Sequence, residues 1–182
     1  MIEPTGAPGG AASMDSRRLF FALWLSDRQR DALRDVIQPV LSGIEGDAID
    51  RRNWHITLVF VGQFPEQKLA ELQAAASGVG VEPFRLRFDR ASFWPRPKIA
   101  CLEAATVPPE LQQLVHRIHE VTGPFGVPPE DHTYRPHITI ARRARTFVTQ
   151  RLTRAIELQC DSFELVESVS VRGGVQYHPV KQ

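Results

Sequence analysis

A His-Ile-Thr tripeptide occurs twice in this chain, at residues 55–57 and 137–139, and each copy lies in an apolar run. The first run reads NWHITLVFVG and the second reads RPHITIARRA. Short aliphatic runs of this kind are typical of buried β-strands, where Val or Ile would be the expected residue instead of histidine. Two such strands, far apart in the sequence, predict two half-domains of similar plan that each supply one copy.

The strand periodicity indicates what the repeated motif can do. Alternate side chains of a strand share a face, so His55 lies with Thr57 and His137 lies with Thr139. If the two strands meet across a cleft, two imidazoles and two hydroxyls converge on one small volume. Imidazoles can donate or accept protons near neutral pH, and hydroxyls can donate hydrogen bonds to phosphate oxygens. A single histidine in an apolar strand is more often a core residue, but the duplication favours phosphodiester chemistry.

Composition places the chain among ordinary globular proteins. Of 182 residues, 42% are hydrophobic and 24% are charged, and the net charge of +1 does not indicate a general nucleic-acid binder. The two cysteines, Cys101 and Cys160, form no CxxC motif and suit a reducing cytoplasm. Residues 1–15 are rich in Gly, Pro, Ala and Ser, so we expect a disordered leader, with Met14 as an alternative start. We expect residues 16–182 to form one domain.

The pattern along the chain mixes helices with neighbouring antiparallel strands, which predicts an α+β fold. No apolar run approaches the roughly 20 residues that a membrane helix needs. Helices are expected at residues 27–42, 65–78 and 108–123, with a short one at 146–156. Strands are expected at residues 17–25, 53–62, 84–94, 99–104, 135–144, 158–173 and 175–180.

The motifs HITLVFVG and RPHITIAR, with the opening RLFFALWL, resemble the two-histidine (2H) phosphoesterase superfamily. Within it, the chain is similar to the bacterial RNA 2′,3′-cyclic phosphodiesterases, also called 2′-5′ RNA ligases, from Arg17 to the C-terminus. The resemblance implies a bilobal fold: two antiparallel-rich sheets related by a pseudo-twofold axis, with helices packed outside and a central cleft. It also implies metal-independent hydrolysis, without cofactor, of a 2′,3′-cyclic phosphate to a 2′-phosphomonoester. Ligation forming 2′-5′ linkages would be the reverse reaction.

The resemblance also implies roles for individual residues. His55 would be the general acid that protonates the 3′-oxygen, and His137 the general base that activates water, although the residues alone do not distinguish this from the reverse. Thr57 and Thr139 would hold the phosphate. Arg142, in the ARRAR segment, is a further candidate phosphate contact. Regular strand phase puts Arg142 on the face opposite His137, so we expect the strand to end or bend before it.

Aromatic side chains can hold unpaired bases by stacking. Trp94 and Tyr134 lie in Pro-rich segments and are the candidates for the rim of the cleft. Tyr177 lies in a closing segment that resembles the family, but no binding role is assigned to it. His116 and His119 have a spacing that can chelate metal, but no third ligand stands at a persuasive offset, so no metal is expected.

Other functional classes remain open at this stage. The chain could be a non-catalytic protein that binds RNA ends or nucleotides, or a phosphodiesterase that acts on small cyclic nucleotides with the same histidine pair. The sequence contains no P-loop, which argues against ATP-dependent ligation. We expect a monomer whose partner is RNA with a 2′,3′-cyclic phosphate end or the corresponding nucleotide, and no membrane association.

Overall fold

The computed structural model describes residues 15–130, 133–145 and 147–181. The expected leader therefore lies outside the described residues, apart from Asp15. Three α-helices are found in the described chain, α1 (Asp27–Leu41), α2 (Leu69–Ser77) and α3 (Pro109–Thr122), with short 3₁₀ helices at Arg51–Asn53, Glu66–Lys68 and Gly123–Phe125. The described strands are β1 (Ser16–Trp24), β2 (Asp47–Ala48), β3 (His55–Pro65), β4 (Phe84–Trp94), β5 (Ile99–Ala104), β6 (His137–Arg142), β7 (Gln150–Cys160), β8 (Glu164–Val171) and β9 (Gly174–Pro179).

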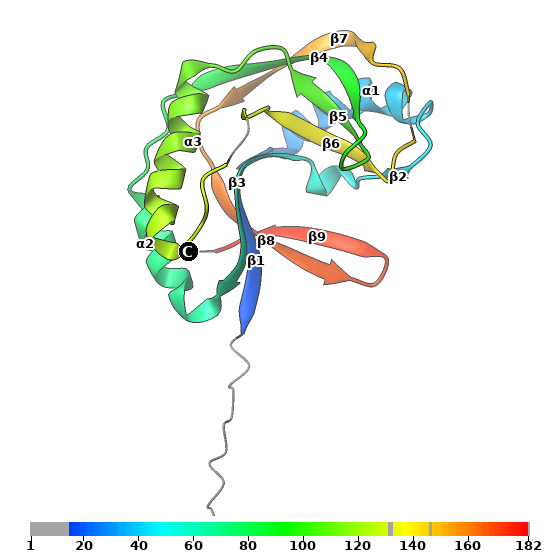
Figure 1. The fold of residues 1–182 in the computed structure, drawn as a ribbon. Coiled ribbons are helices and arrows are strands. Elements are labelled where there is room, and N and C mark those ends of the chain that lie inside the picture. Colours follow the sequence, from blue (N-terminus) through cyan, green and yellow to red (C-terminus); the bar gives the residue numbers. More distant parts are fainter. Residues whose placement is uncertain (1–14, 131–132, 146, 182) are drawn as a thin grey trace, which may run out of the picture.

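The described strands form one curled antiparallel sheet in the order β7-β4-β5-β6-β3-β1-β8-β9, with β2 added beside β6 (Figure 1). The α+β prediction is confirmed. The strands on the two sides of the β3–β6 boundary correspond in pairs. Moving outward from the boundary, β1 corresponds to β5, and β8 corresponds to β4. The two sheets that we expected are thus two halves of one sheet, joined through the single residue pair Ile56 and Ile138. Each half supplies one His-Ile-Thr strand.

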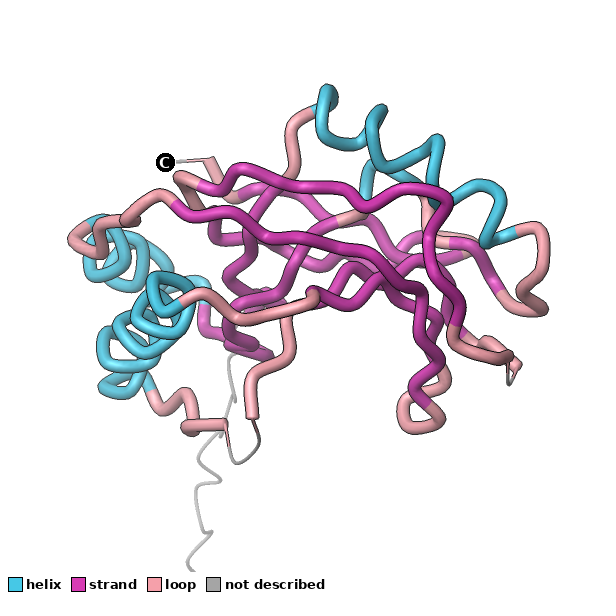
Figure 2. The backbone as a smooth tube through the Cα atoms, turned by 90° about the horizontal axis from the view of Figure 1, so that it is seen from above, coloured by secondary structure: helices cyan, strands magenta, loops and turns pink. Residues whose placement is uncertain are grey.

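Helices α1 and α3 hold equivalent places in the chain. Helix α1 follows β1, which lies beside β3, and α3 follows β5, which lies beside β6. Ser26 caps α1 reciprocally: its hydroxyl accepts from the Gln29 amide at 3.2 Å, and the Gln29 side chain accepts from the Ser26 amide at 2.9 Å. Pro39 lies inside α1, near its end at Leu41. The helices lie at two opposite ends of the strands (Figure 2). No helix of the described residues is both long and apolar enough to cross a membrane.

The expected short helix at residues 146–156 is wrong. Its described part belongs to an extended loop and to β7, which pairs with β4 so that Ile156 faces Phe88 and Leu158 faces Leu86. From Ile156 to Cys160 alternate side chains are buried, as in a strand with one face on the core. The apolar partners on β4 outweigh the weak helical pattern of this segment, because β-branched Thr and Ile fit a pleated surface well.

Candidate active site

The two His-Ile-Thr strands meet at the point where the two halves of the sheet join. Ile56 and Ile138 are direct antiparallel partners, and both are 0% exposed because they point into the core. This register puts His55 opposite Thr139 and Thr57 opposite His137, all on the other face of the sheet. The structure therefore brings the four predicted side chains together in one patch. All four are half-buried.

The two imidazoles are held by the same hydrogen bond. Nδ1 of His55 lies 2.6 Å from the carbonyl oxygen of Asn53, and Nδ1 of His137 lies 2.8 Å from that of Arg135. Since a carbonyl oxygen only accepts, each Nδ1 carries the hydrogen and each Nε2 is left for exchange of a proton. The Thr57 hydroxyl, 3.0 Å from Nε2 of His55, can donate to it. Both rings thus have the tautomer that an acid–base pair requires.

The surroundings lower the pKa of both imidazoles in the free protein. Burial lowers the pKa of His55 to about 4, and the charges of His137, Arg142 and Arg30 act in the same direction. Burial also lowers the pKa of His137, but there the Glu103 carboxylate opposes the shift. Glu103 is the direct cross-strand neighbour of His137 on β5. The two histidines differ in one respect. Among the groups that shift the pKa of each histidine, only those of His137 include a carboxylate, which favours the protonated form.

Arg142 reaches the site through a bulge in β6. Cys101 of β5 pairs with Thr139 and the preceding Ala100 pairs with Ala141, so Ile140 is an extra residue. The extra residue reverses the alternation of side chains, and Arg142 Nη2 lies 3.2 Å from the hydroxyl of Tyr177. The bend expected before Arg142 is therefore present. Among the described residues Arg142 has no carboxylate partner, whereas its neighbours in the basic run, Arg143 and Arg145, pair with Asp47 and Glu45.

Tyr177, to which the sequence analysis assigned no binding role, lies at the site. It lies on β9, its ring centroid is 5.1 Å from that of His55 in an edge-on arrangement, and its hydroxyl meets Arg142. The Asn53 side chain accepts from the Tyr177 amide at 3.2 Å and donates to the Val175 carbonyl at 2.8 Å. These bonds hold the β8–β9 hairpin, which projects beside the end of β6 in Figure 1, against the first motif.

Other aromatic side chains surround His55. Phe20 and Trp24 of β1 have ring centroids 4.9 Å and 6.1 Å from the imidazole. Phe60 follows Thr57 on β3, contacts Phe20 at 6.2 Å and is 62% exposed, which is unusual for phenylalanine in a strand. The spacing of Phe20 and Trp24 indicates a shared face, but only the pairing of β1 with β3 shows that this is the face of His55.

The two rim candidates occupy different places. Trp94 packs on His137 with ring centroids 4.4 Å apart, and the guanidinium of Arg135 lies 4.3 Å from the indole centroid. The Tyr134 hydroxyl donates to the backbone carbonyl of Thr57 at 2.8 Å, and burial raises the pKa of this phenol. Tyr134 thus links the loop before the second motif to the first motif strand.

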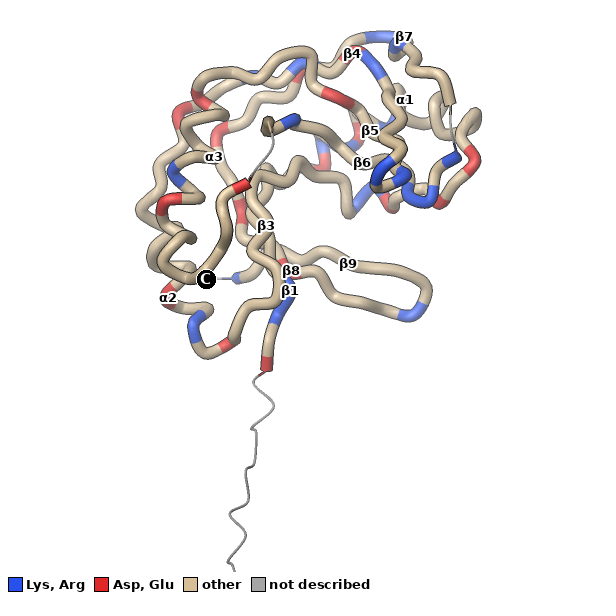
Figure 3. Tube along the Cα trace, in the orientation of Figure 1, with Lys and Arg blue, Asp and Glu red and all other residues tan. Residues whose placement is uncertain are grey.

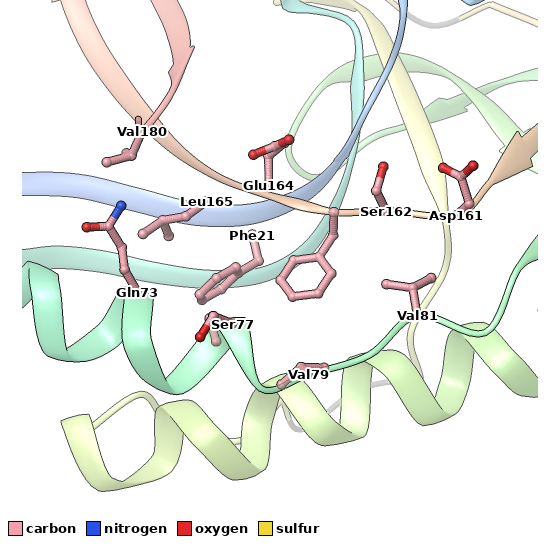
Figure 4. A pocket seen from close by; sticks show the side chains of 12 residues that line it. Phe21, Gln73, Ser77, Val79, Val81, Asp161, Ser162, Glu164, Leu165 and Val180 are labelled. Atoms are coloured by element: carbon pink, nitrogen blue, oxygen red, sulfur yellow. The ribbon is translucent and has the colours of Figure 1, made fainter. Parts of the chain in front are cut away.

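A cavity of about 460 Å³ is lined by three residues that contact His55, namely Trp24, Asn53 and Tyr177. The remaining lining residues are Asp27, Arg30, Asp50, Arg52 and the rest of residues 171–178. Lys and Arg positions also gather near the end of β6 (Figure 3). A second pocket, of about 250 Å³, lies between α2 and β8 and includes Phe21 and Gln73 (Figure 4). None of the four motif side chains lines either pocket, but only the first is lined by side chains that contact His55, so the second is not the candidate site. Within the described residues no group of three or more His, Cys, Asp or Glu is arranged to hold a metal ion.

Two paired imidazoles on facing strands of a bilobal antiparallel sheet define the two-histidine class of phosphoesterase. Residues 23–172 match the family model described as the 2′-5′ RNA ligase superfamily, and the chain belongs to this family. An RNA 2′,3′-cyclic phosphodiesterase of Archaeoglobus fulgidus is 30% identical over 131 residues, which are 70% of this chain and 73% of that protein. The protein of the same name from Escherichia coli is 27% identical over 173 residues, 92% of this chain and 96% of that one.

Solved structures show the same fold. The crystal structure of Escherichia coli LigT complexed with 3′-AMP has a TM-score of 0.81 and 27% sequence identity, and the match covers 92% of this chain and 97% of that one. The PDE domain of MHV ns2 shares the fold alone, with a TM-score of 0.55 and 13% identity.

Proposed function

We propose that this protein is a metal-independent RNA 2′,3′-cyclic phosphodiesterase that opens a 2′,3′-cyclic phosphate to a 2′-phosphomonoester. One observation carries the proposal: two imidazoles lie on facing strands, each with Nδ1 fixed on a carbonyl and Nε2 left for proton transfer. Two such groups supply both proton transfers that the reaction needs. The names of the relatives from Archaeoglobus fulgidus and Escherichia coli support the substrate class.

In the proposed mechanism a water molecule attacks phosphorus as Nε2 of His137 takes its proton. The bond from phosphorus to the 3′-oxygen breaks, and Nε2 of protonated His55 gives its proton to that oxygen. The phosphate stays on the 2′-oxygen. Thr57, Thr139 and Arg142 stabilise the charge that grows on the non-bridging oxygens. With an RNA 5′-hydroxyl in place of water as the nucleophile, the same displacement forms a 2′-5′ linkage.

One observation supports the reverse division of the histidine roles. Burial and neighbouring positive charges disfavour a proton on both imidazoles, but only His137 has a carboxylate, that of Glu103, among the groups that shift it. The bound phosphate carries a negative charge that favours protonation of either imidazole, so the division depends on which imidazole the substrate contacts more closely.

We further propose that the RNA end lies across the aromatic face beside His55, where the exposed ring of Phe60 offers a stacking surface for a base. Trp94 and Tyr134 border the His137 side of the same cleft. The proposed unit is a monomer in which residues 16–182 act together. A cytoplasmic location is supported by the two cysteines, which are unpaired and buried.

Turnover is tested with an oligoribonucleotide that ends in a 2′,3′-cyclic phosphate and with the matching mononucleotide, both in EDTA. We expect hydrolysis of the oligonucleotide to a product with a 2′-phosphate, identified by ³¹P NMR. Saturable binding without turnover would favour the alternative of a non-catalytic RNA-end or nucleotide-binding protein. A preference for the mononucleotide would favour a small cyclic-nucleotide phosphodiesterase.

The pH profile provides a separate prediction. The active form carries one proton on the histidine pair, so kcat/KM peaks between the two pKa values of the free protein. Both values are lowered, that of His55 to about 4, so the imidazolium is lost at lower pH than usual. We expect the kcat/KM optimum on the acid side of 6.5, the usual imidazole value, and a kcat optimum at higher pH because bound phosphate raises the pKa of the acid. A kcat/KM optimum above 6.5 would contradict this.

A further inference from the structure

Both imidazoles lie next to a tryptophan that itself contacts an arginine, although these residues come from different elements. Behind His55 the indole of Trp24 is stacked at 22° with centroids 6.1 Å apart, and the Arg30 guanidinium lies 4.9 Å from that indole centroid. Beside His137 the indole of Trp94 lies at 4.4 Å, and the Arg135 guanidinium lies 4.3 Å from it. Each imidazole thus packs against a tryptophan indole, and each indole in turn packs against an arginine guanidinium.

The tryptophan and arginine side chains beside the two imidazoles include polar atoms that fold stability alone does not explain. Arg30 is only 6% exposed, its Nε and Nη2 have no hydrogen-bond acceptor within the described residues, and the carboxylate of Asp27 lies 3.6 Å from Nη1. The indole Nε1 of Trp94 is also buried without an acceptor in the described chain. Unpaired buried donors and a buried cation are normally unfavourable. Their occurrence beside both histidines indicates a role at the site.

We propose that Trp24 with Arg30, and Trp94 with Arg135, are positioning pairs that fix the orientation of the His55 and His137 imidazoles and place a positive charge behind each ring. The proposal rests on the proposed function, since it assumes that these imidazoles transfer protons. Each indole blocks rotation of its imidazole away from the carbonyl that holds Nδ1. Each arginine in turn stacks on the indole and keeps it in place.

The charges around each imidazole show how the arginines affect its protonation. His55 faces the positive groups Arg30 and Arg142 and its partner His137, and all three oppose its protonation. His137 faces Arg135 and Arg142, which oppose its protonation, and Glu103, which favours it. Glu103 also binds the Arg135 guanidinium, with Nε at 3.1 Å. Within the described residues the ion-pair partner of Arg30 is the exposed carboxylate of Asp27, so the charge of Arg30 is less compensated than that of Arg135.

The pairs are tested by truncating each indole to Leu or replacing it with Phe. We expect Trp24→Leu and Trp94→Leu to lower kcat on a 2′,3′-cyclic nucleotide about 10-fold while KM changes less than about 3-fold, because misorientation of a catalytic group affects the transition state most. Phe retains a ring face and should restore most of kcat. Trp54→Phe is the matched control, since Trp54 is a buried tryptophan whose indole donates to the Ile49 carbonyl at 3.2 Å. It should keep the parent kcat.

The charge is tested with Arg30→Met, for which Arg34→Met on the same helix is the control. Loss of the positive charge raises the pKa of His55, so the kcat/KM optimum should move to higher pH in Arg30→Met and stay in place in Arg34→Met. An unchanged optimum in Arg30→Met, or unchanged kcat in both Leu variants, would overturn the proposal. A rise in KM that depends on the base, with kcat constant, would do the same, because it would identify the indoles as base platforms.

A histidine NMR titration separates failure of this proposal from failure of the proposed function. It reports the pKa and tautomer of His55 and His137 without substrate turnover. If the parent protein hydrolyses no cyclic phosphate, a higher His55 pKa in Arg30→Met and altered ring signals in the Leu variants would still support the positioning pairs. Unaltered titrations in these variants would end the proposal whether or not the protein is active.

Discussion

Replacement of His55 or His137 by alanine is expected to lower kcat for 2′,3′-cyclic phosphate hydrolysis on the order of 10³-fold. In the proposed mechanism each imidazole performs one proton transfer, and no other described side chain at the junction of β3 and β6 is an imidazole held in the same way. Because the two transfers belong to one displacement, the double variant should lose little more than either single variant. Single-turnover rates of the three variants measure this.

The same experiment assigns the acid and the base. A substrate with sulfur in place of the 3′-bridging oxygen has a leaving group that departs without a proton, so it restores the variant that lacks the acid. With the roles proposed, this substrate should rescue His55→Ala and leave His137→Ala inactive; rescue of His137→Ala alone would reverse them. His116→Ala is the control, because His116 is exposed on α3, where it lies 3.5 Å from Glu120. A wild-type rate in either site variant would disprove the two-histidine mechanism.

The sequence predicted most of the site because the strand period is a strong local signal. Alternation alone places each histidine with its threonine, and Ile56 and Ile138 with the core, and the structure has this arrangement. The same signal located most helices and strands. It could not predict that the two halves join through one residue pair, because strand pairing over such a separation depends on tertiary packing.

The residues that sequence reasoning missed share a different cause. Tyr177 and Trp24 reach His55 through the pairing of β9 with β8 and of β1 with β3, which no local pattern contains. Arg142 was predicted as a phosphate contact, but the way in which it reaches the site depends on a bulge, because one extra residue reverses every later side chain of a strand. The helix prediction for the segment around β7 failed for a similar reason. Its helical pattern is local, whereas β4, with which it pairs as a strand, is distant in sequence.

Arg142 is the position at which this bulge has the largest consequence. Its guanidinium touches Tyr177, its charge acts on both imidazoles, and no carboxylate of the described chain neutralises it. A free guanidinium beside a proton-transfer pair is suited to the phosphate oxygens, whose negative charge grows in the transition state. Arg142→Gln should therefore lower kcat/KM about 10²-fold, and Arg142→Lys should lose less, because it keeps the charge without the planar fork.

Arg145→Gln is the matched control, because Arg145 lies in the same basic run but is paired with Glu45 at 3.1 Å. Steady-state kinetics at several salt concentrations distinguish a specific contact from general attraction. A specific contact keeps the loss in Arg142→Gln large at high salt, because contact at the reacting phosphate is screened little, whereas a general basic surface would give equal, salt-sensitive losses in both variants. Equal losses would show that the bulge places Arg142 at the surface of the cleft and not on the reacting phosphate.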